Sequence, residues 1–198
     1  MLKKFKDWLD HVDQSKRQQV KLSDVVVINH PYYINTAGEN FKVTKGSSSD
    51  INDILLMQKE SYGSLQWRRP SLEQDLIYNR RSIYLVMRDK QGDPVAFIGA
   101  WMSDDEVHIS NLCVRPKYQK QGIASFLVNE IGFMGECLNR SIYTLEVRIS
   151  NEKAIRLYER LGFEIVEHKK NYYFDNQEDA YDMRRKLNGV GDSTYDSE

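Results

Sequence analysis

Residues 114–124 have the sequence VRPKYQKQGIA and join a predicted strand to a predicted helix. The strand, over 107–114, stops before Pro116, and a short basic loop leads to Gly122 and Ala124 at the start of an amphipathic helix. The first amides of a helix have no partner inside it, and the helix dipole adds partial positive charge there. Small residues also let a phosphate approach the main chain closely. The stretch therefore predicts an anion site at a helix N-terminus.

This loop alone is not decisive, because many helices begin after a turn that contains glycine. Its spacing lacks the Gly-Lys-Ser/Thr of nucleotide-binding loops and the three glycines of the dinucleotide fingerprint. The anion is therefore not expected to be held as in those folds.

A second informative segment is residues 145–166, LEVRISNEKAIRLYERLGFEIV. It predicts a strand that ends near Arg148, a helix that starts at Ser150-Asn151 and a further strand after Gly162. The helix carries apolar residues at helical spacing, namely Ala154, Ile155, Leu157, Tyr158 and Leu161.

Together the two segments resemble the GCN5-related N-acetyltransferase (GNAT) family. The first matches that family's acetyl-coenzyme A pyrophosphate loop, Gln/Arg-x-x-Gly-x-Gly/Ala, through Gln119, Gly122 and Ala124. The second resembles the ribosomal-protein alanine N-acetyltransferase branch. The C-terminal part also resembles that branch, through Asn171-Tyr172-Tyr173, Glu178-Asp179-Ala180 and Met183. The resemblance covers roughly residues 41–187 and leaves the extra N-terminal residues outside, which puts the exact substrate in doubt.

The apolar pattern predicts a regular order of elements in this part of the chain. The expected strands are 41–45, 82–88, 95–102, 106–114, 142–148, 162–169 and 179–187, and the expected helices are 50–61, 71–79, 122–137 and 151–161. This order fits an α/β fold. The resemblance implies a GNAT-like mixed, mostly antiparallel central sheet flanked by helices, with an N-terminal extension.

The resemblance divides the chain into three predicted parts. These are an N-terminal extension over 1–40, the GNAT domain over 41–187 and a disordered tail over 188–198. Residues 1–21 predict a basic amphipathic helix that either docks on a membrane surface or partner, or packs on its own domain. The apolar run at 25–28, VVVI, predicts an additional strand or a buried segment. The sequence assigns the extension no role.

Composition sets outer limits on function. The chain has 198 residues and a net charge of −1, so it has no overall electrostatic attraction to nucleic acid. Its two cysteines, Cys113 and Cys137, have no metal-like spacing and are expected to act as small buried hydrophobes. No run of 18 apolar residues is present, so no membrane span is expected. These features favour a cytoplasmic protein.

Acetyl transfer from a thioester to an amine needs a deprotonated amine, a polarised carbonyl and a protonated leaving thiolate. The resemblance implies Glu146 as the general base, because residues 145–148 match the family pattern in register. It implies Tyr158 as the acid that protonates the sulfur, because this tyrosine stands where the family has its acid. Without the resemblance, Glu146 fits a solvated strand carboxylate and Tyr158 a packing residue. His108 fits a proton relay or a structural residue and is left out of the catalytic set.

The resemblance also implies the residues that bind acetyl-coenzyme A, with no metal ion. The main chain of 112–114 would pair with the pantetheine amides like an added strand, and one N–H there would polarise the acetyl carbonyl. Asn151 would cap its helix and touch the pantetheine arm. The predicted coenzyme-binding residues are Leu112, Cys113, Val114, Gln119, Lys120, Gln121, Gly122, Ile123, Ala124, Ser125 and Asn151.

The function favoured by the resemblance is acetylation of a protein N-terminal α-amine, by the pattern of the branch the alanine of a ribosomal protein. Trp67, Tyr172 and Tyr173, on predicted loops, are candidates to clasp this acceptor, although each fits the core equally well. One alternative is a small-amine acetyltransferase acting on a polyamine or antibiotic. Another is a non-catalytic module that binds acetyl-coenzyme A, against which the presence of Glu146 and Tyr158 argues. No direct nucleic-acid binding is expected.

Overall fold

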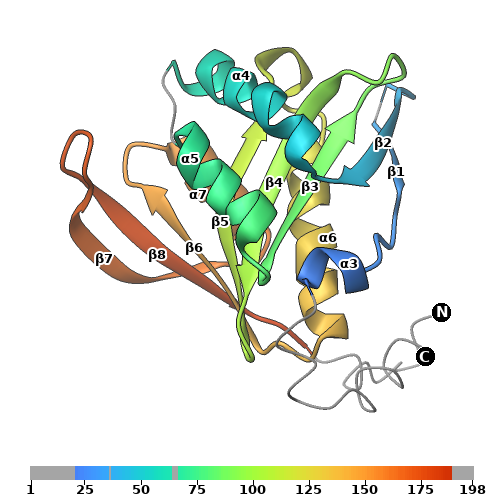
Figure 1. The fold of residues 1–198 in the computed structure, drawn as a ribbon. Coiled ribbons are helices and arrows are strands. Elements are labelled where there is room, and N and C mark those ends of the chain that lie inside the picture. The colour runs from blue at the N-terminus through green and yellow to red at the C-terminus, as the bar shows by residue number, and fades with distance from the viewer. Residues whose placement is uncertain (1–20, 36, 64–66, 189–198) are drawn as a thin grey trace.

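An eight-stranded sheet with the order β1-β2-β3-β4-β5-β6-β8-β7 runs through the molecule. The structure is a computed structural model that describes residues 21–35, 37–63 and 67–188 (Figure 1). All neighbouring strands pair antiparallel except β5 and β6, which are parallel. The expected mixed, mostly antiparallel sheet is confirmed. The strands are β1 (Tyr32–Ile34), β2 (Asn40–Lys45), β3 (Ser82–Arg88), β4 (Pro94–Met102), β5 (Glu106–Val114), β6 (Ile142–Arg148), β7 (Glu164–Tyr173) and β8 (Glu178–Lys186).

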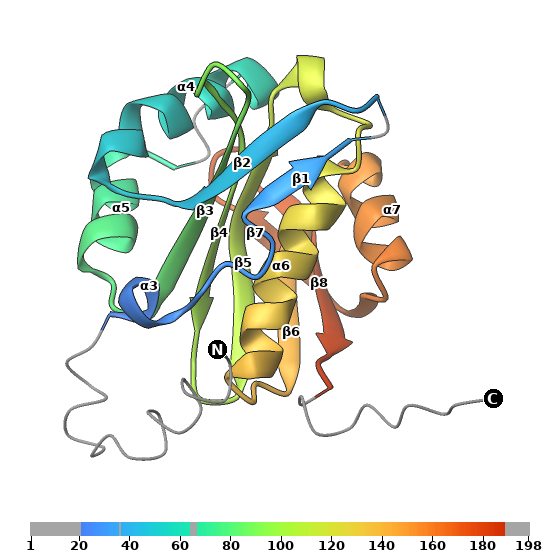
Figure 2. The ribbon, with the colours of Figure 1, turned by 90° about the vertical axis from the view of Figure 1, so that its right-hand side faces the viewer.

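Helices cover both faces of this sheet (Figure 2). One face carries α4 (Ile51–Tyr62) and α5 (Arg69–Glu73), and α5 continues into a π-helical turn at Gln74–Tyr78. The other face carries α6 (Ile123–Cys137) and α7 (Glu152–Arg160). Alternate residues of each strand point to opposite faces, so Ile83 and Leu85 of β3 join the core under α6 while Tyr84 and Val86 join the core under α4.

The pairing of β5 with its neighbours changes halfway along the strand. The register with β4 shifts between Gly99 and Ala100, which leaves Ser110 as an extra residue of a β-bulge. The bulge reverses the alternation, because Ile109 and then Leu112 both face the α6 core. The parallel ladder with β6 ends at Ile109↔Leu145. Beyond it, residues 110–114 of β5 and 146–148 of β6 diverge, and we call this region the fork (Figure 1).

The described part of the N-terminal extension belongs to the same sheet. The strand considered for 25–28 is not formed, because α3 (Leu22–Val25) is followed by irregular chain in which Val26 is buried and Val27 is 60% exposed. The extension instead supplies β1, which pairs with β2. The helix predicted over 1–21 and the tail predicted over 188–198 lie almost entirely outside the described residues.

Two further observations concern the whole described chain. None of its helices is long and apolar enough to cross a membrane. Within these same residues, no group of three or more His, Cys, Asp or Glu side chains is arranged to hold a metal ion.

Candidate active site

The predicted anion loop has the geometry of an open helix N-terminus. Gly122 is the N-cap of α6 with φ 81°, and Lys120 has φ 61°, so two residues of the turn lie in the left-handed region. No side chain caps α6, and the amides of residues 120–125 donate to no other group of the described chain. Six consecutive N–H groups at the positive end of a 15-residue helix are therefore available to an anion.

The fork exposes main-chain groups of β5 that β6 does not pair. The carbonyl of Leu112 accepts from the Tyr62 hydroxyl, and the carbonyl of Val114 accepts from Ser61 Oγ at 3.3 Å and Gln119 Nε2 at 3.1 Å. An extended residue directs its N–H and C=O to the same side, so the Leu112 and Val114 amides face the fork too. Cys113 does not share this role, because alternation turns its main chain toward β4.

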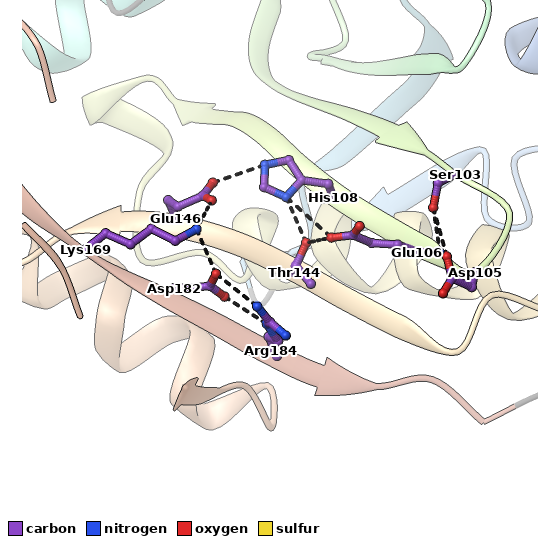
Figure 3. A network of polar contacts seen from close by, with 9 residues as sticks. All are labelled: Ser103, Asp105, Glu106, His108, Thr144, Glu146, Lys169, Asp182 and Arg184. Atoms are coloured by element: carbon purple, nitrogen blue, oxygen red, sulfur yellow. Dashed lines mark hydrogen bonds and ion pairs between the residues drawn. The ribbon is translucent and has the colours of Figure 1, made fainter. Parts of the chain in front are cut away.

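The carboxylate of Glu146 lies at the centre of a polar network on β5, β6, β7 and β8 (Figure 3). Its Oε1 is 2.7 Å from Lys169 Nζ, and its Oε2 is 3.2 Å from His108 Nε2. Lys169 Nζ also lies 2.8 Å from Asp182 Oδ2. On the other side of the imidazole, His108 Nδ1 is 2.8 Å from Thr144 Oγ1, which donates to Glu106 Oε1 at 2.5 Å.

This network governs the acidity of Glu146. Partial burial raises the pKa of Glu146, but hydrogen bonds from His108 and Lys169, together with electrostatic attraction to these two side chains, outweigh burial and bring the pKa to about 2. Glu146 is therefore ionised at neutral pH and binds a proton weakly. For Lys169, burial lowers the pKa, but the Asp182 and Glu146 carboxylates raise it by a larger amount. The net pKa therefore lies above the usual range of lysine. The pair is a stable ionic contact at neutral pH.

Three tyrosine hydroxyls gather at the fork from three elements. Tyr158 of α7 is buried on the α6 face, and burial together with the nearby Tyr173 raises its pKa well above the usual range. Tyr62 approaches from α4 on the opposite face; burial, Cys113 and Tyr158 raise the pKa of its hydroxyl in the same direction. For Tyr173, burial raises the pKa to about 12, even though Arg148 acts against it. All three hydroxyls stay protonated at neutral pH and can donate hydrogen bonds.

The hairpin of β7 and β8 is fixed to β6 by Arg148. This guanidinium contacts Asp175 at 2.9 Å and Glu178 at 3.1 Å, and it lies 3.8 Å from the centre of the Tyr173 ring. Beside it, the pKa of Tyr172 is raised, mainly by burial and also by the negative charge of Glu146 and a hydrogen bond with that carboxylate. The two tyrosines belong to β7 and not to a loop, so their predicted location was wrong, while their position next to Glu146 suits an acceptor site.

The remaining predicted residues take simpler positions. Asn151 caps α7, because its Oδ1 accepts from Ala154 N at 3.2 Å. Ile123, the first residue of α6, is buried in the core, and Ala124 and Ser125 follow it in the first turn. Trp67 does not join Tyr172 and Tyr173; it lines an open cavity of about 650 Å³ with residues of α5 and the π-helical turn.

Sequence reasoning missed three neighbours of the site. His108 was set aside, although its place on β5 opposite Thr144 of β6 brings it to Glu146. Lys169 and Tyr62 come from segments far from Glu146 along the chain, and no local motif marks them. For Lys169 the signal is the strand pairing itself, since β7 reaches β6 only through β8, whereas Tyr62 reaches the fork from the C-terminal end of α4.

Comparison with known proteins shows the family of the chain. A model of the acetyltransferase (GNAT) family matches residues 50–163, which include the loop, the fork, Glu146 and Tyr158. The chain belongs to this family. As a GNAT member it is an N-acetyltransferase that depends on acetyl-coenzyme A.

Several GNAT relatives are named for the same activity. The ribosomal protein bS18-alanine N-acetyltransferase of Escherichia coli is 37% identical over 119 residues, 58% of this chain and 79% of that protein. A Bacillus subtilis protein that carries the same name provisionally is 31% identical over 139 residues, 70% of this chain and 91% of its own. The crystal structure of the ribosomal-protein-S18-alanine N-acetyltransferase from Escherichia coli matches with a TM-score of 0.68 at 26% identity, covering 78% of this chain and 99% of that one.

Proposed function

We propose that this enzyme acetylates the N-terminal α-amine of a protein, with a ribosomal protein that begins with alanine as the first candidate. The observation that carries the proposal is the relationship to the Bacillus subtilis and Escherichia coli proteins, which extends over 91% and 79% of their lengths. The contacts of Glu146, Tyr158 and Tyr172 around the fork support it.

The donor acetyl-coenzyme A fits two features of the chain. The free amides of residues 120–125 suit its diphosphate, with Lys117 and Lys120 as nearby positive charges. The amides of Leu112 and Val114 suit the pantetheine arm, which would pair with β5 where β6 does not. When bound there, the thioester supplies the activated acetyl group. A main-chain N–H of β5 then stabilises the negative charge that develops on the acetyl oxygen.

The amine nitrogen attacks the acetyl carbon, and its proton passes to Glu146. A carboxylate whose pKa is about 2 holds a proton only briefly. We therefore propose that His108 takes the proton onward through the chain His108, Thr144 and Glu106. While Glu146 is ionised, His108 Nε2–H donates to it. Once Glu146 has taken the amine proton, the Nδ1–H tautomer serves as the relay: Nε2 accepts from Glu146, His108 Nδ1–H donates to Thr144 and Thr144 donates to Glu106. Glu106 is 30% exposed and can release the proton to water.

The bond between the acetyl carbon and sulfur breaks as the amide forms, and sulfur leaves as a thiolate. Tyr158 keeps its proton at neutral pH because its pKa is raised. Tyr158 therefore donates its proton to the departing sulfur and afterwards regains a proton from solvent, so that the products are an acetylated amine and free coenzyme A and the enzyme is restored.

The acceptor class is tested with three substrates at equal concentration. One is a peptide with a free N-terminal alanine, the second is the same peptide with a blocked N-terminus and an internal lysine, and the third is spermidine. Mass spectrometry should find acetylation of the free α-amine with the highest kcat/KM. Preference for the blocked peptide or for spermidine would overturn the N-terminal assignment. Absence of any acetylated product from an enzyme that binds acetyl-coenzyme A would favour a regulatory binding module.

A further inference from the structure

A segment outside the family match lies against the predicted coenzyme loop. Residues 30–35, which we call the strap, cross α6 and form β1 at the edge of the sheet (Figure 2). The His30 N–H donates to Glu130 Oε2 at 3.2 Å and its imidazole pairs with the same carboxylate, which is only 3% exposed. Further along, the Tyr33 ring packs on Phe126 with 4.8 Å between centroids. The strap is thus fixed along α6 before it reaches the loop.

Two side chains of the strap hold the residue before Gly122. The Tyr33 hydroxyl donates to the Gln121 carbonyl oxygen at 2.6 Å, and Asn35 Nδ2 donates to Gln121 Oε1 at 2.7 Å. Asn35 is itself fixed, because its Oδ1 accepts from the N–H groups of Ala37 and Glu39. A methyl group added at Gly122 would overlap the Tyr33 hydroxyl, so the strap also lies directly on this glycine.

These contacts set the direction of one peptide group. In a planar trans peptide the C=O and the following N–H point in opposite directions. Because the Gln121 carbonyl is held toward Tyr33, the Gly122 N–H points away from the strap and is free to bind another group. The loop needs such support, because Lys120 holds a left-handed conformation that residues with a side chain rarely adopt.

We propose that Tyr33 and Asn35 are positioning residues for the coenzyme diphosphate, which fix the Gln121–Gly122 peptide in its binding orientation before the donor arrives. The inference rests on the proposed acetyl-coenzyme A site at residues 119–125. Neither residue needs to touch the reacting atoms. Preorganisation of this kind lowers the free-energy cost of binding and leaves the chemical step unchanged.

The expected effect is therefore on coenzyme affinity. A typical protein hydrogen bond contributes a net 0.5–1.5 kcal/mol, so Tyr33→Phe should raise the Kd for acetyl-coenzyme A by between about twofold and about tenfold. The value of kcat at saturating donor and the KM for the acceptor peptide should stay unchanged. Gln121→Ala removes the acceptor of the Asn35 bond and leaves the Asn35 turn intact, and it should weaken binding in the same direction.

The matched control is Tyr32→Phe, the same chemical change one residue earlier. Tyr32 is 58% exposed, and its hydroxyl bonds no other residue in the described part of the chain. Calorimetry on the full chain should give this variant the wild-type Kd. Acetyl-pantetheine, which carries the thioester but lacks the diphosphate, serves as the second donor. Its kcat/KM should be the same in wild type and Tyr33→Phe, because the loop has no diphosphate to hold.

Each result has a definite meaning. An unchanged Kd in both Tyr33→Phe and Gln121→Ala overturns the role of the strap while the coenzyme site stands. An equal loss of kcat/KM with acetyl-coenzyme A and acetyl-pantetheine assigns Tyr33 a general structural role and also overturns it. If the wild-type enzyme itself does not bind acetyl-coenzyme A more tightly than acetyl-pantetheine, the proposed diphosphate site fails, and the strap proposal fails with it.

Discussion

Replacement of Glu146 by glutamine should lower the stability of the fold by an amount that depends on pH in a calculable way. The ordinary pKa of a glutamate side chain is 4.5, and the His108 and Lys169 contacts bring that of Glu146 to about 2. A difference of this size corresponds to about 3 kcal/mol of preferential stabilisation of the ionised carboxylate in the folded state. Because the folded pKa is the lower one, this contribution is complete above pH 4.5 and is lost as the pH falls toward 2.

Glutamine cannot ionise, so the variant lacks this contribution at every pH. Its amide oxygen can still accept from Lys169, so the loss at pH 7 should be below 3 kcal/mol, on the order of 1–2 kcal/mol. The difference between wild type and variant should be constant from pH 7 to about 5.5 and shrink below about pH 4.5. Urea unfolding at pH 7, 5.5, 4.5 and 3.5 measures it.

The control is Glu159→Gln on α7, an exposed carboxylate that pairs with no other described residue. It should change stability little at any of these pH values. A loss in Glu146→Gln that is the same at pH 7 and pH 3.5 would mean that packing, and not the ionic contacts, is what the substitution removes. No loss at pH 7 would refute the network itself.

Three further changes test the site and its supports. Tyr158→Phe should lower kcat by roughly 10²–10⁴-fold in single-turnover kinetics with an unchanged Kd for acetyl-coenzyme A, and near-normal turnover would leave Tyr158 a packing residue. Gly122→Ala should lower the free energy of unfolding in urea by about 1 kcal/mol more than Gly92→Ala. Both glycines have positive φ, but only at Gly122 would the added methyl group overlap the Tyr33 hydroxyl. Equal losses in the two variants would contradict this contact. Asn151→Ala removes the cap of α7 and should cost about 1 kcal/mol in the same assay, whereas an unchanged midpoint would exclude a capping role.

The central part of the fold was predictable because its elements have clear patterns. The strands β3 and β6 begin and end at the predicted residues, and β5 does so as well. These strands are bounded by turn residues and alternate or run apolar over their length. By contrast, β1 is three residues long, and its residues are mostly exposed, so no apolar period marks it. The strand β7 extends to Tyr173, beyond its predicted end at 169. The prediction missed this part because Lys170 and Asn171 are exposed and polar and do not continue an apolar pattern.

The site was predictable only where a motif is local. Gly122 and the helix start are visible in a single stretch, as are Glu146 and Tyr158 once the family pattern is recognised. The partners of Glu146 are not, because Lys169 reaches it through the order β6-β8-β7 and His108 through the parallel pairing with β5. The low pKa of Glu146 depends on both partners, so the sequence alone could not choose between the relay and the structural role that were open for His108.

The fork has a mechanical consequence. The sheet consists of β1 to β5 on one side and β6, β8 and β7 on the other, and the ladder that joins them runs only from Glu106↔Ile142 to Ile109↔Leu145. A donor bound between the diverging strands would contact both parts of the sheet and add to the few contacts that join them. A ligand at 100 times its Kd adds about 2.7 kcal/mol to the free energy of unfolding. The enzyme should therefore resist heat and proteolysis best when its donor is plentiful, and its lifetime would follow the supply of acetyl groups.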